Sequence, residues 1–462
     1  MTASALSSLW QAAGGDPAAL DHIRLEGEGP VLPSSFRVAE MAQAAIAAVG
    51  LAAAQAWFAR SGQWQTVGVD RRHAAAEFRS EQLLTIDGRG PGSLWDPIAG
   101  LYATAGGGHI RLHTNFEHHR DAVCDLLGCF AERDAVAREL ACRDAVAFED
   151  TLHANGGVGA ALRCQADWDA HPQGQAVAAL PLIAPERIGD APPRALREGP
   201  RPLSGLKVLD LTRIIAGPVG GRALAAHGAT VMRIASPALP FIDWAVKDTG
   251  QGKYSAYCDL TTEEGRQTLA RLVADADIVL DAYRPCALER LGFGPADLAR
   301  LRPGIVHVSL NAWGQQGPWA GRRGFDSLVQ TAAGFNDEEG RAAGDGAPRA
   351  LPCQALDHGT GYVVALAAIL MRLRQAGEGG SWSVRLSLAR TALWLRSLGR
   401  VEGAFGLVSP SAGDMPDLME DAASSFGTMR RVRHAARLSA TPAFWERASV
   451  ALGSDPPVWP HD

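Results

Sequence analysis

The stretch that decides the fold is Lys207-Val208-Leu209-Asp210-Leu211, followed by Ala216-Gly217-Pro218. A short apolar run and then a Gly-Pro turn predict a buried strand that leads into a helix. The same alternation of strand and helix continues downstream, which is typical of a parallel α/β sheet. We therefore expect an α/β, Rossmann-like large domain. Its further strands are predicted at Thr230–Ile234, Asp277–Leu280 and Ile305–Leu310, and its later helices begin near Thr261 and Pro295.

The turn after the first predicted strand carries no phosphate-binding fingerprint. Its residues, 216–221, match neither G-x-G-x-x-G nor G-x-x-x-x-G-K-[ST]. Dinucleotide and P-loop nucleotide sites therefore lose their main support, because both rely on those glycine-rich cradles.

The domain organisation is predicted from changes in sequence texture along the 462 residues. The richest Pro/Arg stretch, residues 191–202, is expected to be a linker. It separates a smaller α/β domain, 87–190, from the Rossmann-like large domain, 203–400, which would follow it. Residues 1–86 are expected to be a helical N-terminal segment, and 401–462 a C-terminal extension.

An internal repeat is a further expectation. Glu40–Ser80 can be laid on Asp357–Ser397 at a constant offset, with helix, Gly-containing turn, strand and helix in the same order. This alignment makes the N-terminal segment a degraded copy and places Glu40 opposite Asp357. The identities are Gly62, Val67, Ala75, Arg79 and Ser80 with Gly379, Val384, Ala392, Arg396 and Ser397.

Composition excludes several classes of protein. With 47% hydrophobic and 20% charged residues the chain should fold, and a net charge of −6 without a basic block disfavours nucleic-acid binding. The longest apolar stretches, Ala44–Ala54 and Gly361–Met371, are too short to span a bilayer, so no membrane partner is expected. No secretory signal is visible, and seven cysteines without a CxxC pair indicate reduced thiols, so we expect a cytoplasmic protein.

Asp357 is the first candidate for chemistry. It precedes an apolar helix predicted over Tyr362–Met371 and has glycines close by. One interpretation is an ordinary helix cap, because a carboxylate at this end meets exposed amides and the positive end of the helix dipole. The other is a nucleophile toward an activated acyl group, since the glycines leave room for a bulky ligand and so apolar a helix should open onto a partly dry cleft.

Asp326 is the second candidate. It follows Arg322-Arg323-Gly324-Phe325 and is either a loop carboxylate neutralised by its neighbours or a site residue. Arg213 and Arg233 lie at or near strand ends, where they suit an anionic ligand at the carboxyl edge of the sheet.

Two other kinds of site are not expected. His113, His118 and His119 lack a matching carboxylate or an i, i+4 partner, which argues against a metal site. No G-x-S-x-G elbow is present to anchor a Ser/His/Asp triad.

Several ordered motifs resemble those of the family III CoA-transferases (CaiB/BaiF type), the group of formyl-CoA transferase, carnitine CoA-transferase and α-methylacyl-CoA racemase. The resemblance begins at Pro202–Arg213 and covers about 200 residues, which makes it far more specific than a lone fingerprint. The later motifs are Ala216-Gly217-Pro218, His227-Gly228-Ala229, Lys253-Tyr254-Ser255, Tyr283-Arg284-Pro285, Leu291-Gly292-Phe293, Gly314–Pro318, Gly324-Phe325-Asp326 and Leu356–Gly361.

The resemblance implies an acyl-CoA:carboxylate CoA-transferase that takes coenzyme A as part of its substrate, needs no metal and forms a homodimer, which could be interlocked. Asp357 would become acylated, and Asp326 would be a nearby acidic residue. Amides near a turn at Gly359–Gly361 would stabilise oxyanions. The coenzyme A contacts implied are Arg233, Ser236, Arg284 and Arg290 at the nucleotide and Arg323 at the pantetheine end.

The chain also departs from the family pattern. Phe325 stands where racemase members carry a His, Ile215 where some transferases carry a Gln, and the usual basic residue is replaced near Ser236. Family members begin with the Rossmann-like part, whereas here the smaller domain comes first, as in a permuted chain or a trimmed tandem fusion. Two alternatives stay open, namely a non-catalytic CoA-binding or heteromeric partner subunit, and an acyl-CoA isomerase or racemase.

Overall fold

The computed structural model describes residues 2–460 of the chain, and its largest feature is a seven-stranded sheet. The strand order is β10-β9-β8-β11-β12-β13-β7, and only the β13/β7 pair is antiparallel. The predicted Rossmann-like α/β class is therefore confirmed. The strands are β7 (Ala184–Gly189), β8 (Lys207–Leu211), β9 (Thr230–Ala235), β10 (Lys253–Tyr257), β11 (Ile278–Asp281), β12 (Val306–Asn311) and β13 (Ser381–Ser387).

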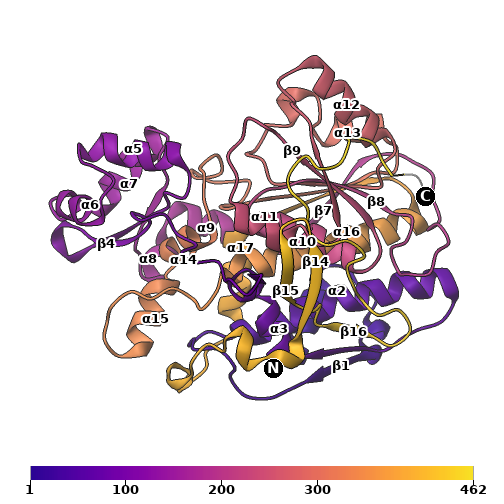
Figure 1. Cartoon of the computed structure of the whole chain (residues 1–462), viewed down its shortest axis with the longest axis horizontal. Helices are drawn as coiled ribbons and strands as arrows, with labels where there is room; N and C mark the ends of the chain where they lie inside the picture. Colours follow the sequence, from indigo (N-terminus) through magenta and orange to yellow (C-terminus); the bar gives the residue numbers. More distant parts are fainter. Residues whose placement is uncertain (1, 461–462) are drawn as a thin grey trace.

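Helices cover both faces of this sheet because its strands are apolar on both sides. In β8, Val208 packs into the core cluster that contains α10 (Ala216–Ala226) and α16 (Ala355–Glu378), and Leu209 packs into the opposite cluster. That opposite cluster holds side chains of α12 (Glu263–Ala274) and α13 (Pro295–Leu301). Figure 1 shows α12 and α13 on one side of the sheet and α10 and α16 on the other.

The helix that carries Asp357 begins earlier than the sequence predicts. The expected start was Tyr362, but α16 runs from Ala355 to Glu378 and so includes Asp357, Gly359 and Gly361. The reason is tertiary, since a carboxylate from another helix satisfies its first-turn amides, as described below. A smaller shift affects α12, whose N-cap is Thr262 rather than Thr261.

The smaller lobe, on the left in Figure 1, contains the antiparallel sheet β4-β5-β6 and helices with a core of their own. β7 lies inside the segment predicted as the smaller domain, yet it pairs with β13 of the large sheet. The predicted linker that follows is packed against the large domain, where Arg194 pairs with Asp277 at 2.5 Å. The elements of this lobe are β4 (Gly100–Ala103), β5 (His109–Leu112), β6 (Gly159–Ala161), α5 (Glu117–Leu127), α6 (Arg133–Leu140), α7 (Ala145–Ala154), α8 (Gln165–Ala170) and α9 (Pro172–Ala178).

The two segments of the predicted repeat have matching elements. Helices α2 (Val38–Ser61) and α16 each have 24 residues, and the offset that lays Val38 on Ala355 also lays Asp70, the cap of α3 (Arg71–Glu77), on Ser387, the cap of α17 (Leu388–Ser397). The sheet β1-β2-β16 also has one parallel and one antiparallel pair in the same order as β12-β13-β7. Its strands are β1 (Ile23–Glu26), β2 (Val67–Asp70) and β16 (Ala436–Leu438).

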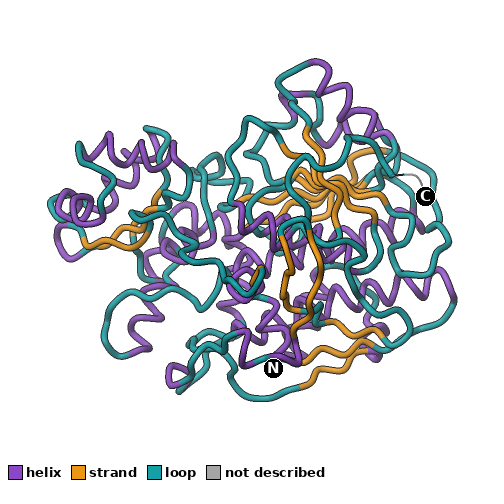
Figure 2. The backbone as a smooth tube through the Cα atoms, in the orientation of Figure 1, coloured by secondary structure: helices purple, strands orange, loops and turns teal. Residues whose placement is uncertain are grey.

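A small sheet joins segments that are far apart in the sequence. β14 and β15 pair with β3 in a sheet that joins C-terminal residues to the N-terminal segment, and Figure 2 shows it as a separate group of strands. The elements still to be named are β3 (Thr85–Ile86), β14 (Met419–Ser424), β15 (Gly427–Val432), α1 (Thr2–Ala12), α4 (Ser80–Leu83), α11 (Asp243–Thr249), α14 (Asp326–Ala332) and α15 (Phe335–Ala343).

Helix α2 is long and apolar enough to cross a membrane. Its longest uninterrupted apolar stretch, Ala44–Ala54, is too short by itself to do so. Among residues 2–460 helix α2 alone meets those criteria, and 83% of the apolar window is buried. It packs against α1 and α16. The apolar residues of α2 are therefore buried in the protein core.

Candidate active site

Asp357 is the third residue of α16, and another carboxylate caps this helix. The residue before the helix, Gln354, makes no side-chain capping bond. Instead, Oδ2 of Asp326, the first residue of α14, accepts hydrogen bonds from the Leu356 N–H at 2.8 Å and the Asp357 N–H at 2.9 Å. Asp326 therefore fixes the backbone at Asp357, and of the two interpretations of Asp357 the helix cap is wrong.

Burial shapes the ionisation of both acids. Asp326 is fully buried, and burial raises its pKa to about 6 against the pull of its hydrogen bonds from the Asp357 and Leu356 amides and the Gln330 side chain. Asp357 is 7% exposed, and burial together with the charges of Asp326 and Glu81 raises its pKa well above the usual range. Its carboxyl makes no hydrogen bond to any of residues 2–460, so it is free to meet a ligand.

A third carboxylate lies nearby, from the segment that precedes the smaller domain. Glu81, in α4, is 2.9 Å from Nε2 of His358, the residue after Asp357. The charge of His358 and this hydrogen bond outweigh burial and lower the pKa of Glu81. The site thus holds an ionised Glu81 beside an Asp357 whose proton is held more tightly.

Asp357 opens into a cavity of about 370 Å³ that we call the arginine cavity. Its walls include Arg213, Arg284, Arg322 and Arg323. Arg322 pairs with Asp150 at 2.6 Å, whereas the other three have no ion-pair partner among residues 2–460. Burial and the charge of Arg284 lower the pKa of Arg323. Three guanidinium groups without counter-charges among residues 2–460 make this cavity electrostatically suited to an anion.

Asp357 also lines a second cavity, of about 90 Å³, that we call the tryptophan cavity. Its walls are mainly aromatic and aliphatic, with a few side-chain amides. Among residues 2–460, no Lys or Arg lines it. The lining residues are Glu81, Gln82, Leu94, Trp95, His113, Asn115, Ile214, Ile215, Ile242, Trp244, Ala245, Phe325, Gln354 and Asp357.

The structure gathers some of the predicted contact residues and separates others. Arg284 and Arg323 line the arginine cavity together with Arg213. Arg233 and Ser236 instead line a narrow cavity of about 40 Å³ beside β9, and Arg233 is 5% exposed. Arg290 is exposed in the short turn Glu289–Leu291 and lines none of these cavities. The cavity of Arg233 and Ser236 borders the arginine cavity, since both include Arg213 and Ile214, so only Arg290 stands apart from the other predicted contacts.

The predicted turn at Gly359–Gly361 is wrong. Both glycines lie inside α16, where backbone N–H groups donate to carbonyls one turn earlier and cannot stabilise an oxyanion. Their small size serves packing instead. A Cβ on Gly361 would lie 2.4 Å from the Ala216 oxygen of α10, and one on Gly359 would lie 3.0 Å from Met41 Cε of α2.

Sequence reasoning missed several residues of the tryptophan cavity. Glu81, Trp95 and Trp244 carry no motif and come from three separate segments. His113 was considered only as a metal ligand, but its ring stacks on Phe325 at 3.6 Å between centroids. Burial lowers the pKa of His113 to about 3, so it is neutral. Within residues 2–460 no group of three or more His, Cys, Asp or Glu is placed to hold a metal ion.

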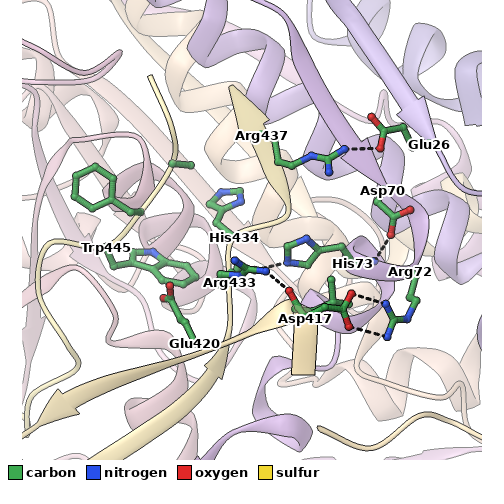
Figure 3. A pocket seen from close by; sticks show the side chains of 13 residues that line it. Glu26, Asp70, Arg72, His73, Asp417, Glu420, Arg433, His434, Arg437 and Trp445 are labelled. Atoms are coloured by element: carbon green, nitrogen blue, oxygen red, sulfur yellow. Dashed lines mark hydrogen bonds and ion pairs between the residues drawn. The ribbon is translucent and has the colours of Figure 1, made fainter. Parts of the chain in front are cut away.

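A larger cavity, of about 470 Å³, lies at the ends of β1 and β2 and contains neither Asp357 nor Asp326 (Figure 3). Two of the arginines that line it have acidic partners. Arg72 binds Asp417 at 2.8 Å, and Arg437 binds Glu26, while Arg433 has none among residues 2–460. This cavity offers an anion fewer unpaired guanidinium groups than the arginine cavity does, so we do not assign the site here.

The sequence model described as CoA-transferase family III matches residues 203–456, more than half of the chain. The chain belongs to CoA-transferase family III. The match covers the large sheet except β7, together with the arginine-bearing loops, Asp326 and Asp357.

Individual family III relatives match over parts of their length. The chain is 37% identical over 212 residues to acetyl-coenzyme A transferase nodX of Hypoxylon pulicicidum, covering 45% of this chain and 36% of that protein. It is 33% identical over 210 residues to a probable fatty acyl-CoA transferase of Mycobacterium tuberculosis, covering 43% and 53%. The chain thus spans about half or less of these relatives. A crystal structure of a CaiB/BaiF family protein from Brucella suis matches with 28% identity and a TM-score of 0.40, covering 50% of this chain and 65% of that one.

Proposed function

We propose that this chain is an acyl-CoA:carboxylate CoA-transferase with Asp357 as its nucleophile. The observation that carries the proposal is the place of Asp357, whose carboxyl lines both the arginine cavity and the tryptophan cavity. The first suits the phosphates of coenzyme A, and the second suits an acyl group. A thioester bound across the two would bring its carbonyl carbon to Asp357.

The proposed reaction keeps coenzyme A on the enzyme. A carboxylate oxygen of Asp357 attacks the thioester carbon and the C–S bond breaks, giving a mixed anhydride and CoA thiolate. The thiolate then attacks the Asp357 carbonyl carbon and releases the donor acid, leaving an aspartyl-CoA thioester. An acceptor carboxylate attacks that carbon and displaces the CoA thiolate, giving a second mixed anhydride. The thiolate then attacks the acceptor's carbonyl carbon, which forms the new acyl-CoA and frees the Asp357 carboxylate.

The surroundings of Asp357 suit this cycle. Attack requires the ionised form, and burial beside Asp326 and Glu81 makes that form costly and hence reactive. Asp326 acts as a positioning residue because it holds the Asp357 backbone. Oxyanion donors must come from side chains, since the glycine amides are used within α16. Gln354 and Asn115 supply amides in the tryptophan cavity.

The test traps the intermediate. We expect the protein mixed with an acyl-CoA and hydroxylamine to yield a hydroxamate on Asp357, detected by mass spectrometry of the peptide. Asp357→Asn should abolish the product and lower exchange of acyl groups between CoA and acids by at least about 10³-fold, in line with loss of a covalent nucleophile.

The matched control is Glu40→Gln, because Glu40 occupies the equivalent place at the start of α2 and pairs with Arg37 at 2.9 Å. It should leave both readouts unchanged. Failure of every acyl-CoA that binds to yield a hydroxamate would instead favour a non-catalytic CoA-binding or partner subunit. An isomerase or racemase is disfavoured, since Phe325 holds the histidine position and burial lowers the pKa of His113 to about 3, which makes its imidazole a weak base.

A further inference from the structure

The two cavities that meet at Asp357 differ sharply in charge. Ile214, Phe325 and Asp357 line both cavities and form the boundary between them. Four arginines stand on one side of that boundary, and no cationic side chain stands on the other. A ligand that crosses the boundary therefore meets positive charge at one end and an apolar, partly acidic lining at the other.

We propose that the tryptophan cavity is the acyl subsite and that it selects short, uncharged acyl groups over long or dicarboxylic ones. The inference rests on the proposed transferase function and names the substrate class of that site. Two properties of the cavity carry it, its fixed small volume and its charge.

The volume is fixed because the walls are held from outside. Trp95 lies beneath the Arg111 guanidinium at 5.2 Å and meets the His113 ring edge-on at 5.9 Å. His113 in turn stacks on Phe325. On the opposite side the Trp244 indole N–H donates to the Glu81 backbone oxygen at 2.7 Å. Well-anchored aromatic walls around about 90 Å³ leave no room for a long chain, because drug-sized ligands occupy pockets of about 300 Å³ or more.

Backbone strain marks the same boundary. Ile214 adopts a φ of 72°, which is rare for a β-branched residue and costs on the order of 1–3 kcal/mol. The turn thereby places Ile214 where both cavities meet, with Ile215 beside it in the tryptophan cavity. An apolar side chain kept at this boundary despite the cost of its backbone conformation is consistent with an apolar ligand in the tryptophan cavity.

The charge excludes a second carboxylate. Glu81 is ionised against His358, which does not line the cavity, and the lining histidine His113 is neutral. The far carboxylate of a dicarboxylic acyl group would lose its water, face Glu81 and find no cation. Burying an unpaired charge is more costly than burying a methyl group, so the acyl group should be uncharged.

The test compares kcat/KM for butyryl-CoA, octanoyl-CoA and succinyl-CoA, with acetate as the acceptor. We expect butyryl-CoA to exceed each of the others at least about tenfold, the scale of discrimination that pocket size supplies. Trp95→Ala should reduce the ratio of kcat/KM for butyryl-CoA to that for octanoyl-CoA. Glu81→Gln, which can still accept a hydrogen bond from His358, should reduce the ratio of kcat/KM for butyryl-CoA to that for succinyl-CoA. Trp64→Ala is the matched control, since Trp64 stacks on His22 and Phe58 and lines neither cavity.

Binding to Asp357→Asn provides a second readout that needs no turnover. Calorimetry should show butyryl-CoA binding at least about tenfold more tightly than succinyl-CoA or octanoyl-CoA. Equal use or equal binding of succinyl-CoA or octanoyl-CoA would overturn the acyl-subsite inference and leave the transferase intact. Selective binding without any hydroxamate would refute the transferase and keep the subsite.

Discussion

At the scale of single residues, the site depends on a carboxyl group kept where it is expensive to ionise. The Asp357 carboxyl is buried, makes no side-chain hydrogen bond to residues 2–460 and faces two other acids. Such an arrangement lowers the stability of the fold while it raises the reactivity of the group. With Asp357 as the proposed nucleophile, function and stability would compete at this residue.

The competition predicts a pH-dependent gain in stability. A raised pKa in the folded state means that the folded protein binds the proton more tightly, so stability falls as pH rises above the unfolded value near 3.8. Asp357→Asn should therefore unfold with a free energy on the order of 1–3 kcal/mol above wild type at pH 8. Urea unfolding at pH 8 and pH 4 measures this difference, which should shrink toward zero in acid. A variant less stable than wild type at pH 8 would contradict the account.

At the scale of elements, the close approach of α10, α16 and α2 sets where Asp357 lies. Gly361 lets α16 pass against α10, and Gly359 lets it pass against α2. These residues are helix-weakening by themselves, so their value must lie in packing. The glycine motif that the sequence predicts as a turn is instead the part of α16 that packs against α10 and α2.

Paired alanine substitutions in α16 should show this. Gly361→Ala places a Cβ 2.4 Å from the Ala216 oxygen and should cost at least about 2 kcal/mol of unfolding free energy, as overpacking does. Gly377→Ala meets nothing within 4 Å and should gain about 0.5–1 kcal/mol from helix propensity. Chemical unfolding of the two variants checks the pair. A Gly361→Ala protein as stable as Gly377→Ala would mean that the helices do not touch here.

Element prediction succeeded where the signal is local. The strands β8, β9, β11 and β12 match their predicted ranges within a residue, since apolar runs in a parallel sheet identify themselves. The start of α16 was missed because its cap, Asp326, lies in a different helix. A capping carboxylate from another element leaves no trace in the residues next to the helix.

At the scale of the whole molecule, the N-terminal and C-terminal segments are joined to α16 at one buried carboxylate. Glu77 of α3 accepts hydrogen bonds from the Tyr362 hydroxyl and from the Ala435 N–H at 2.7 Å, and His434 lies 3.6 Å away. Burial opposes its ionisation, but the charges of His434 and Arg222 and these hydrogen bonds lower its pKa. Three distant parts of the chain share this one anion.

Glu77→Ala should therefore destabilise the assembly by about 3–5 kcal/mol near neutral pH, because it leaves buried donors without a partner. A lowered pKa gives stability that is present above the unfolded value near 4.5 and is lost as pH falls through the folded value, so the deficit should shrink in acid. Glu28→Ala, at an exposed position, is the control and should change stability by less than about 0.5 kcal/mol. Urea unfolding measures the stability of each variant, and limited proteolysis reports whether the terminal segments loosen. A Glu77→Ala protein that matches Glu28→Ala in both measurements would contradict the prediction.

The sequence by itself determined the class of sheet, the family and the acid at the start of α16, because strand periodicity and contiguous motifs are local properties. Only the tertiary structure decided what surrounds that acid. Glu81, Trp95 and Trp244 converge on Asp357 from separate segments, while Arg290, near in sequence to a matching motif, does not line the arginine cavity. The physical reason is that the shape and charge of a cavity depend on all the side chains that packing brings together. These side chains come from separate segments, so no single stretch of sequence is enough to predict them.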